Sequence, residues 1–133
     1  MENRTGGRIN IEIVSKINSE YFYNTDASQF NFIRIPKLLV TGEDFSSLFI
    51  SAKILYGMLL DRMELATKNN WMDDERRIYI LYQLSEIQED MNISRRKAVD
   101  SLMELEDAGL VQKQQSGNGK PTKIYVKNFI KRL

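Results

Sequence analysis

A change in hydrophobic period at Gly109 constrains the fold of this chain more than any other sequence feature. After Ser94, apolar residues recur at helical spacing, and from Leu110 onward they alternate with polar residues. The helical stripe consists of Ala98, Val99, Leu102 and Leu105. Ser94 is a good N-cap, and Gly109 suits the left-handed position that ends a helix. The sequence therefore predicts a helix followed by a hairpin, with strands over Leu110–Gln115 and Lys123–Lys127.

Shorter patterns upstream complete a recognisable order of elements. A helical stripe from Ser51, which we take as its N-cap, to Lys68 precedes the polar loop Trp71–Arg77. The aromatic and β-branched run Ile78–Tyr82 predicts a short buried strand. Ser85 is expected to cap a second helix, which a tight turn joins to the helix after Ser94. The order helix, strand, helix, helix, hairpin predicts an α+β winged helix-turn-helix.

The N-terminal part of the chain has a different character. Alternating isoleucines indicate a strand near residues 9–13, and extended chain is expected over residues 30–35 before Pro36 interrupts any ladder. We therefore expect an additional N-terminal extended or β segment. Residues 1–29 are interpreted as an N-terminal arm and residues 30–133 as the winged-helix domain. Three consecutive aromatics, Tyr21, Phe22 and Tyr23, motivate the hypothesis that the arm forms a homodimer.

Composition limits the chemistry that the chain can perform. Its 133 residues suit one domain, and it contains neither cysteine nor histidine. Thiolate and imidazole metal sites and His-based acid/base catalysis are therefore excluded, and we expect no enzyme, no cofactor and no metal. The acidic run Asp73–Glu75 lacks the spacing of a calcium loop and is interpreted as solvated loop. The sequence has no bilayer-spanning apolar run and no secretion signal, which favours the cytoplasm.

The charges on the helix after Ser94 are inverted. Its first turn holds Arg95, Arg96 and Lys97, while Glu104, Glu106 and Asp107 fill its last turn. The helix macrodipole favours the opposite arrangement, by about 0.3–1 kcal/mol for each charge. A first turn that faces a polyanion would explain the basic end, and the first residues of a recognition helix read the DNA major groove. The alternative is a solvated basic turn beside acidic neighbours.

These features predict a double-stranded DNA interface. Either Arg95 or Arg96 is expected to bond guanine O6 and N7, because the planar guanidinium fits both acceptors. The other arginine, Lys97 and the Ser94 hydroxyl are expected to hold phosphates. The hairpin adds donors for the DNA backbone, or alternatively is merely solvated. These donors are Lys113, Gln114, Asn118, Lys120 and Lys123. The net charge is only +1, yet residues 108–133 carry six basic residues and no acidic one.

Three segments give the chain a family resemblance. They are FNFIRIPKLLV, LFISAKILYGMLLDRMELATKNNWMDDERRIYILY and ISRRKAVDSLMELEDAGLVQKQQSGNGKPTKIYV. From Phe30 to about Val126 the chain resembles the N-terminal domain of the replication initiator A family of Gram-positive plasmids. The resemblance implies a homodimer that binds repeated origin sequences, and a longer protein whose C-terminal domain contacts host replication proteins. It places the DNA-binding surface on residues 94–97 and on the 113–123 wing.

Two other functions fit the same fold. A transcriptional repressor would use this surface and add an effector pocket among the aromatics. A protein-interaction winged helix would present the basic hairpin to an acidic partner, and steep salt dependence of duplex binding would argue against it. The Asn69-Asn70-Trp71 segment favours the initiator over the repressor through the resemblance, whereas the physics of the DNA surface does not separate the two.

Overall fold

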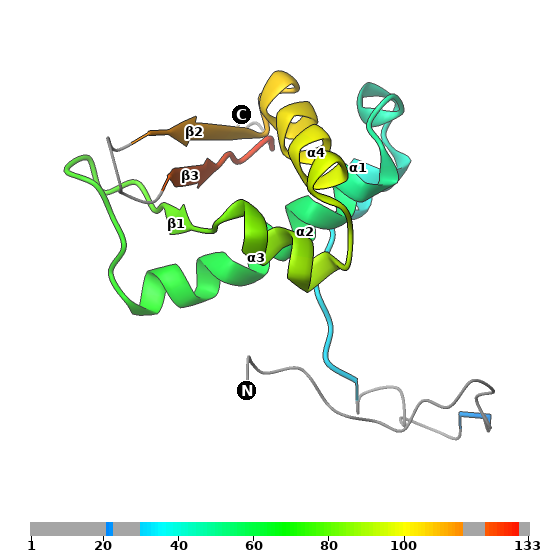
Figure 1. The fold of residues 1–133 in the computed structure, drawn as a ribbon, viewed down its shortest axis with the longest axis horizontal. Helices are drawn as coiled ribbons and strands as arrows, with labels where there is room; N and C mark the ends of the chain where they lie inside the picture. The colour runs from blue at the N-terminus through cyan, green and yellow to red at the C-terminus, as the bar shows by residue number, and fades with distance from the viewer. Residues whose placement is uncertain (1–20, 23–29, 116–121, 131–133) are drawn as a thin grey trace. The chain divides into compact units, whose positions relative to one another are not determined.

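A computed structural model describes residues 21–22, 30–115 and 122–130 of the chain. The chain divides into two units, Met1–Phe32 and Ile33–Leu133, and the described helices and strands belong to the second. In order they are α1 (Lys37–Thr41), the 3₁₀ helix η2 (Glu43–Phe45), α2 (Ile50–Lys68), β1 (Ile80–Leu81), α3 (Leu84–Met91), α4 (Arg95–Asp107), β2 (Val111–Gln114) and β3 (Lys123–Val126) (Figure 1). The predicted order from α2 to β3 is confirmed, while the strand expected near residues 9–13 lies outside the described residues.

The long helix α2 supports the other elements because it is buried along one side. Its buried residues are Ala52, Leu55, Tyr56, Gly57, Leu59 and Ala66. The segment Ile33–Ile35 passes so close to Gly57 that a Cβ added there would lie 2.7 Å from Cγ1 of Ile35 and 3.1 Å from the Arg34 carbonyl oxygen. Glycine in mid-helix therefore allows the incoming chain to lie directly on α2.

Three short antiparallel strands form one sheet in the order β1-β3-β2. Ile80 pairs with Ile124, and Val111 pairs with Val126, so that the apolar side of the sheet closes the core. The chain that leaves β3 stays attached, because the amide of Lys127 donates to Leu110 O at 2.9 Å. The Tyr56 hydroxyl of α2 donates to Lys127 O at 2.7 Å. The C-terminal end of β3, the central strand, is thereby held against α2.

The helix-turn-helix consists of α3 and α4, which pack on each other and on α2 (Figure 1). Ile87 from α3, Leu105 from α4 and Leu55 from α2 are fully buried in one core. Asn92 ends α3 in the left-handed conformation, with φ of 56°, and this residue begins the turn into α4. Gly109 has φ of 82° just after α4, as the sequence predicted. The turn and the glycine together set the two limits of α4.

Two N-cap predictions are wrong. Helix α2 begins at Ile50 after Phe49, and Ser51 lies inside its first turn. Helix α3 begins at Leu84 after Gln83, so Ser85 is also inside the helix. The Gln83 side chain and Glu86 form a reciprocal capping box, which satisfies amides that a serine cap would otherwise satisfy.

Two short elements before α2 were not predicted. Pro36 precedes α1, where its fixed φ suits a helix start, and residues 30–36 belong to no strand. The predicted strand Ile78–Tyr82 is shortened to β1, with an isolated bridge between Met72 and Ile78. No helix in the described part of the chain is long and apolar enough to cross a membrane.

Candidate nucleic-acid interface

The first turn of α4 is a solvent-exposed cationic surface. Ser94 caps the helix as predicted, because its Oγ accepts the amide of Lys97 at 3.0 Å. Ser94, Arg95, Arg96 and Lys97 are all exposed. The Ser94 hydroxyl hydrogen is not used by this cap, so the same group can still donate to an anion. The structure therefore brings together the four predicted residues at one exposed helix end.

The three cations of this turn have different neighbours. Arg96 Nε lies 3.6 Å from Asp100 Oδ2, one turn further along α4. The Lys97 ammonium lies over the ring of Phe49, 5.1 Å from its centroid. Arg95 forms no ion pair among the described residues. The basic turn is thus exposed, and within the described part of the chain only Arg96 has a carboxylate partner.

The acidic end of α4 has a structural explanation that the sequence did not reveal. Glu104 Oε1 accepts the Phe49 amide at 2.7 Å and so caps α2 from a neighbouring helix. Glu106 Oε1 lies 3.6 Å from the Lys113 ammonium on β2. Two of the three acids therefore attach α4 to α2 and to the sheet. Contacts within the fold account for much of the acidic end, while Arg95 has no ion pair with any residue that the structure describes.

The register of the hairpin separates the predicted wing residues onto two faces. Lys113 pairs with Ile124 on the side that faces α4. Gln114 pairs with Lys123 on the opposite side of the sheet. The Lys123 ammonium lies 4.6 Å from the centroid of the Tyr79 ring. The other two predicted wing residues, Asn118 and Lys120, lie outside the described residues.

The loop between α2 and β1 is fixed to β3 by Asp73. Asp73 Oδ1 accepts the amides of Glu75 and Arg77, each at 2.9 Å. Its Oδ2 accepts from Arg77 Nε at 2.8 Å and from the Tyr125 hydroxyl at 3.0 Å. The Arg77 amide is the main cause that lowers the pKa of Asp73 to about 2. Asp73 therefore organises this loop, and no group of acidic residues suited to a metal occurs among the described residues.

A polar cluster fixes α3 against α2. The Tyr82 hydroxyl donates to Asp90 Oδ2 at 2.6 Å, and Arg62 lies over the Tyr82 ring at 3.9 Å. Arg62 also lies within 3.7 Å of Glu86 and 3.5 Å of Asp90. Burial first, and the hydrogen bond to Asp90 second, raise the pKa of Tyr82. This cluster orients the helix that precedes α4.

The helix α4 is tied to α2 at a second point by a buried polar contact. Ser101 is fully buried, and its Oγ lies 2.8 Å from Ser51 Oγ. A buried hydroxyl without a partner would be costly, so each serine satisfies the other. Together with the Glu104 cap, this contact fixes the axial position of α4 on α2.

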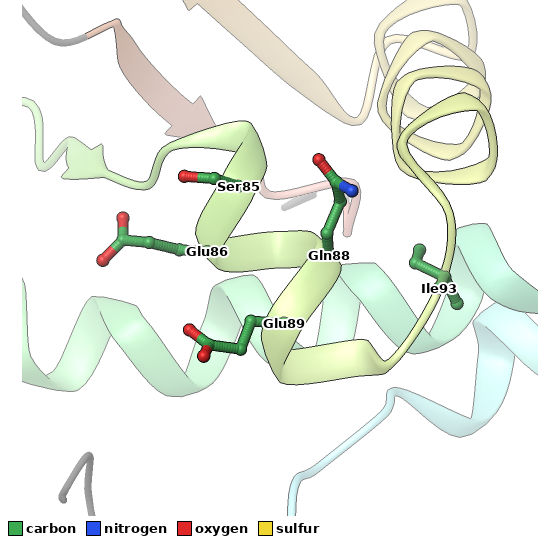
Figure 2. A pocket seen from close by; sticks show the side chains of 5 residues that line it. All are labelled: Ser85, Glu86, Gln88, Glu89 and Ile93. Atoms are coloured by element: carbon green, nitrogen blue, oxygen red, sulfur yellow. The ribbon is translucent and has the colours of Figure 1, made fainter. Parts of the chain in front are cut away.

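A shallow hollow lies beside α3 and the turn into α4 (Figure 2). Its lining residues are Ser85, Glu86, Gln88, Glu89 and Ile93. Two carboxylates give the hollow an acidic lining, opposite in charge to the first turn of α4. Glu86 is already held by the Gln83 amide at 2.9 Å. Ser85 has no basic neighbour among the residues that line this hollow.

These elements define a winged helix-turn-helix domain of the DNA-binding class, with α3 and α4 as the helix pair and the β2–β3 hairpin as the wing. The family described as "Replication initiator protein A (RepA) N-terminus" matches residues 31–133. The chain therefore belongs to this family of replication initiators. The resemblance noted in the sequence is confirmed.

Solved structures share this fold. One described as "N-Terminal domain of DNA binding protein" is 30% identical, has a TM-score of 0.71 and matches 86% of this chain and 88% of that chain. Another, "Structure of Rep-DNA complex", is 31% identical, has a TM-score of 0.70 and matches the same shares of the two chains. "Structure of MDR initiator" is 28% identical, with a TM-score of 0.66, over 82% of this chain and 86% of that chain.

A curated relative from Lactobacillus helveticus, described as a 41 kDa protein, is 24% identical over 118 residues. The match includes 84% of this chain and 31% of the relative. The chain therefore spans about a third of the length of that relative.

Sequence reasoning missed the residues that support the interface. Asp100 follows Arg96 by four positions, a spacing that brings side chains together on a helix and could have been recognised. Phe49 and Glu104 carried no such signal, because they are far apart in sequence and meet only when α2 and α4 pack.

Proposed function

We propose that this chain is the sequence-specific DNA-binding domain of a plasmid replication initiator, which binds double-stranded DNA at repeated sites of the origin. The observation that carries the proposal is the exposed first turn of α4, where three cations stand on a capped helix end. Such a turn enters the major groove in helix-turn-helix proteins, while the wing contacts the DNA backbone. Family membership and the likeness to a chain from a Rep-DNA complex favour an initiator over a repressor.

Selection from a pool of random duplexes tests this function. The 133-residue chain should enrich a defined motif, and binding to that motif should weaken steeply as salt rises, because phosphate contacts release counterions. Enrichment of a motif that also recurs several times at one plasmid origin would support the initiator. Binding without any preferred sequence, or binding that does not respond to salt, would contradict the proposal.

The proposed mechanism is binding alone. Without histidine or cysteine, the chain lacks the common acid/base and thiol chemistry, and we propose that it is no enzyme and needs no cofactor. Because the chain spans a third of its curated relative, contacts with host replication proteins are assigned to a further domain of a longer protein. The proposed place of action is the cytoplasm, where plasmid DNA lies.

We further propose that the chain acts as a homodimer through its N-terminal aromatics. Phe22 and Phe30 lie 6.0 Å apart between ring centroids, Phe30 and Phe32 lie 6.4 Å apart, and all three are at least half exposed. Large aromatics left in water favour a protein interface.

Sedimentation of the full chain tests the dimer. The double variant Phe22→Ser, Phe30→Ser should shift the protein toward monomer. Ile50→Ser is the control, because Ile50 is an apolar residue of the other unit that is more exposed than either phenylalanine. An unchanged sedimentation coefficient in the double variant would place the dimer contact elsewhere.

A further inference from the structure

The exposed face of α4 has a centre and two edges. Ala98, Ser101, Leu102 and Leu105 form the buried side of the helix. At about 3.6 residues per turn, the residues opposite this side are Arg96, Asp100, Met103 and Asp107. Met103 is 48% exposed even though it is apolar, and the Arg96 side chain is 88% exposed. Arg96 therefore stands at the centre of the face that points away from the protein.

The other two cations of the first turn lie at the edges. Lys97 is on the side of α2, since its ammonium lies over the Phe49 ring. Arg95 is on the other side, in line with Glu106 about three turns further on, which pairs with the wing residue Lys113. When such a helix enters the major groove, its central residue meets the base edges and its flanking residues meet the two phosphate walls.

Asp100 holds Arg96 in a way that leaves the arginine available. The contact at 3.6 Å joins Asp100 Oδ2 to Nε of Arg96, which is the guanidinium nitrogen nearest to the backbone. No ion pair engages the two terminal nitrogens of Arg96 among the described residues. A bond to guanine O6 and N7 needs two nitrogens of the guanidinium in one plane, and the terminal pair can provide them.

From this geometry we infer that Arg96 reads a guanine and that Asp100 is the positioning residue that orients Arg96 for it. Arg95 and Lys97 then bind phosphates on opposite walls of the groove. The inference rests on the proposed function, and it resolves which of the two adjacent arginines reads the base. In water the exposed pair is weak, whereas the groove removes water from it and strengthens the attraction. Asp100 therefore affects discrimination more than it affects stability.

The experiment compares variants of the full chain on the selected motif and on an unrelated duplex of equal length. Each guanine of the motif is replaced in turn by 7-deazaguanine, which lacks the N7 acceptor. In the parent, one such replacement should weaken binding by at least about fivefold, because it removes one of the two acceptors that a bidentate arginine uses. Arg96→Ala should bind the normal and the modified duplex equally. In Asp100→Ala, the ratio of affinities for the normal and the 7-deazaguanine duplex should be at least about threefold smaller than in the parent.

Two controls separate positioning from general effects. Asp107→Ala removes an acid from the same face without touching Arg96, so it should leave the discrimination unchanged. Arg95→Ala should weaken binding to both duplexes alike and reduce the salt slope by about 1. Asp100→Ala should bind the unrelated duplex at least as tightly as the parent, because it removes a charge that repels phosphate. An equal loss on the selected and the unrelated duplex, with guanine discrimination retained, would contradict a positioning role for Asp100.

Full guanine discrimination in Asp100→Ala would overturn the role of Asp100. Loss of discrimination in Arg95→Ala with retention in Arg96→Ala would overturn the choice of arginine. Both results presuppose that the parent selects a motif. A parent that enriches none would overturn the proposed function itself.

Discussion

Substitutions at Ser94 separate the stability of α4 from its affinity for DNA. Ser94→Ala removes the Oγ that accepts the Lys97 amide at 3.0 Å and leaves an N-terminal amide without its cap. Ser94→Asp keeps a capping oxygen and adds a negative charge at the positive end of the helix dipole. The charge also lies beside three cations. It therefore stabilises the folded protein without DNA through both the helix dipole and the neighbouring cations. In a complex, the same charge would face phosphate.

The expected magnitudes follow from this geometry. Loss of an N-cap costs about 1 kcal/mol, within a range of roughly 0.5–2. For a domain of this size such a change lowers the unfolding midpoint by about 4–8 °C. Ser94→Asp should leave the midpoint unchanged or raise it, because a carboxylate in the first turn contributes about 0.3–1 kcal/mol. Its affinity for duplex DNA should fall, and its salt slope should decrease by about 0.9 for the phosphate contact that is offset.

Thermal unfolding and a salt series of duplex binding, measured on the same samples, test both effects. Ser94→Ala should be less stable, and at temperatures where it is folded its salt slope should equal that of the parent, because the substitution changes no charge. Ser94→Asp should be as stable as the parent and should bind DNA more weakly. If Ser94→Asp binds duplex DNA as tightly as the parent, the first turn of α4 does not face the phosphates.

Three other perturbations address the scaffold and the wing. Gly57→Ala should lower the unfolding midpoint, because the added Cβ would lie 2.7 Å from Ile35 Cγ1 and 3.1 Å from the Arg34 carbonyl oxygen. Two such close approaches put the overpacking cost toward the upper part of the usual range of about 1–3 kcal/mol, above the helix-propensity gain of about 1 kcal/mol. An equal or higher midpoint would refute this packing. Asp73 has a pKa lowered from 3.8 to about 2, so its contribution to stability is present above about pH 4 and is lost as the pH falls through about 2. In Asp73→Asn, the free energy of unfolding should therefore change less between about pH 4 and pH 2 than it does in the parent. The same change in both proteins would contradict the role of Asp73. Lys120→Ala with Lys123→Ala should weaken binding to every duplex and reduce the salt slope by about 1.8, and an unchanged slope would remove the wing from the interface.

The elements that sequence predicted best are those whose limits are set by local chemistry. Ser94 caps α4 with its own side chain, and Gly109 adopts the left-handed conformation that ends it. Both signals involve residues within a few positions of one another, so no knowledge of the tertiary fold was needed. The change to an alternating pattern after Gly109 likewise reports the pleat of β2 and β3, which is a local property of the backbone.

The predictions that failed concern caps that tertiary contacts replaced. Ser51 looks like an N-cap, but Glu104 from α4 accepts the Phe49 amide, and the Ser51 hydroxyl meets Ser101 inside the domain. The sequence gives no indication of a contact across 50 positions. Helix α1 was missed because five residues are too few to show a helical period, and only Leu39 of the five is buried.

The candidate site was predictable as a set of residues but not as an arrangement. Alternation along the hairpin predicts that Lys113 and Gln114 point to opposite sides of the sheet. The sequence does not tell which of the two sides α4 covers, and the structure places Lys113 on that side, beside Glu106. The helical spacing of Arg96 and Asp100 was visible in the sequence, whereas their place at the centre of the exposed face depended on Ser101 being buried.

The inverted charges of α4 can now be divided into two groups with different causes. Glu104 and Glu106 oppose the helix dipole at its C-terminal end, and each contacts another element of the fold. Removing either acid would relieve the dipole and at the same time loosen α4 from α2 or from the sheet. Arg95 opposes the dipole at the other end, and no ion pair within the described residues compensates it. Its unfavourable position costs about 0.3–1 kcal/mol, and under the proposed function a phosphate of a bound duplex would offset that cost.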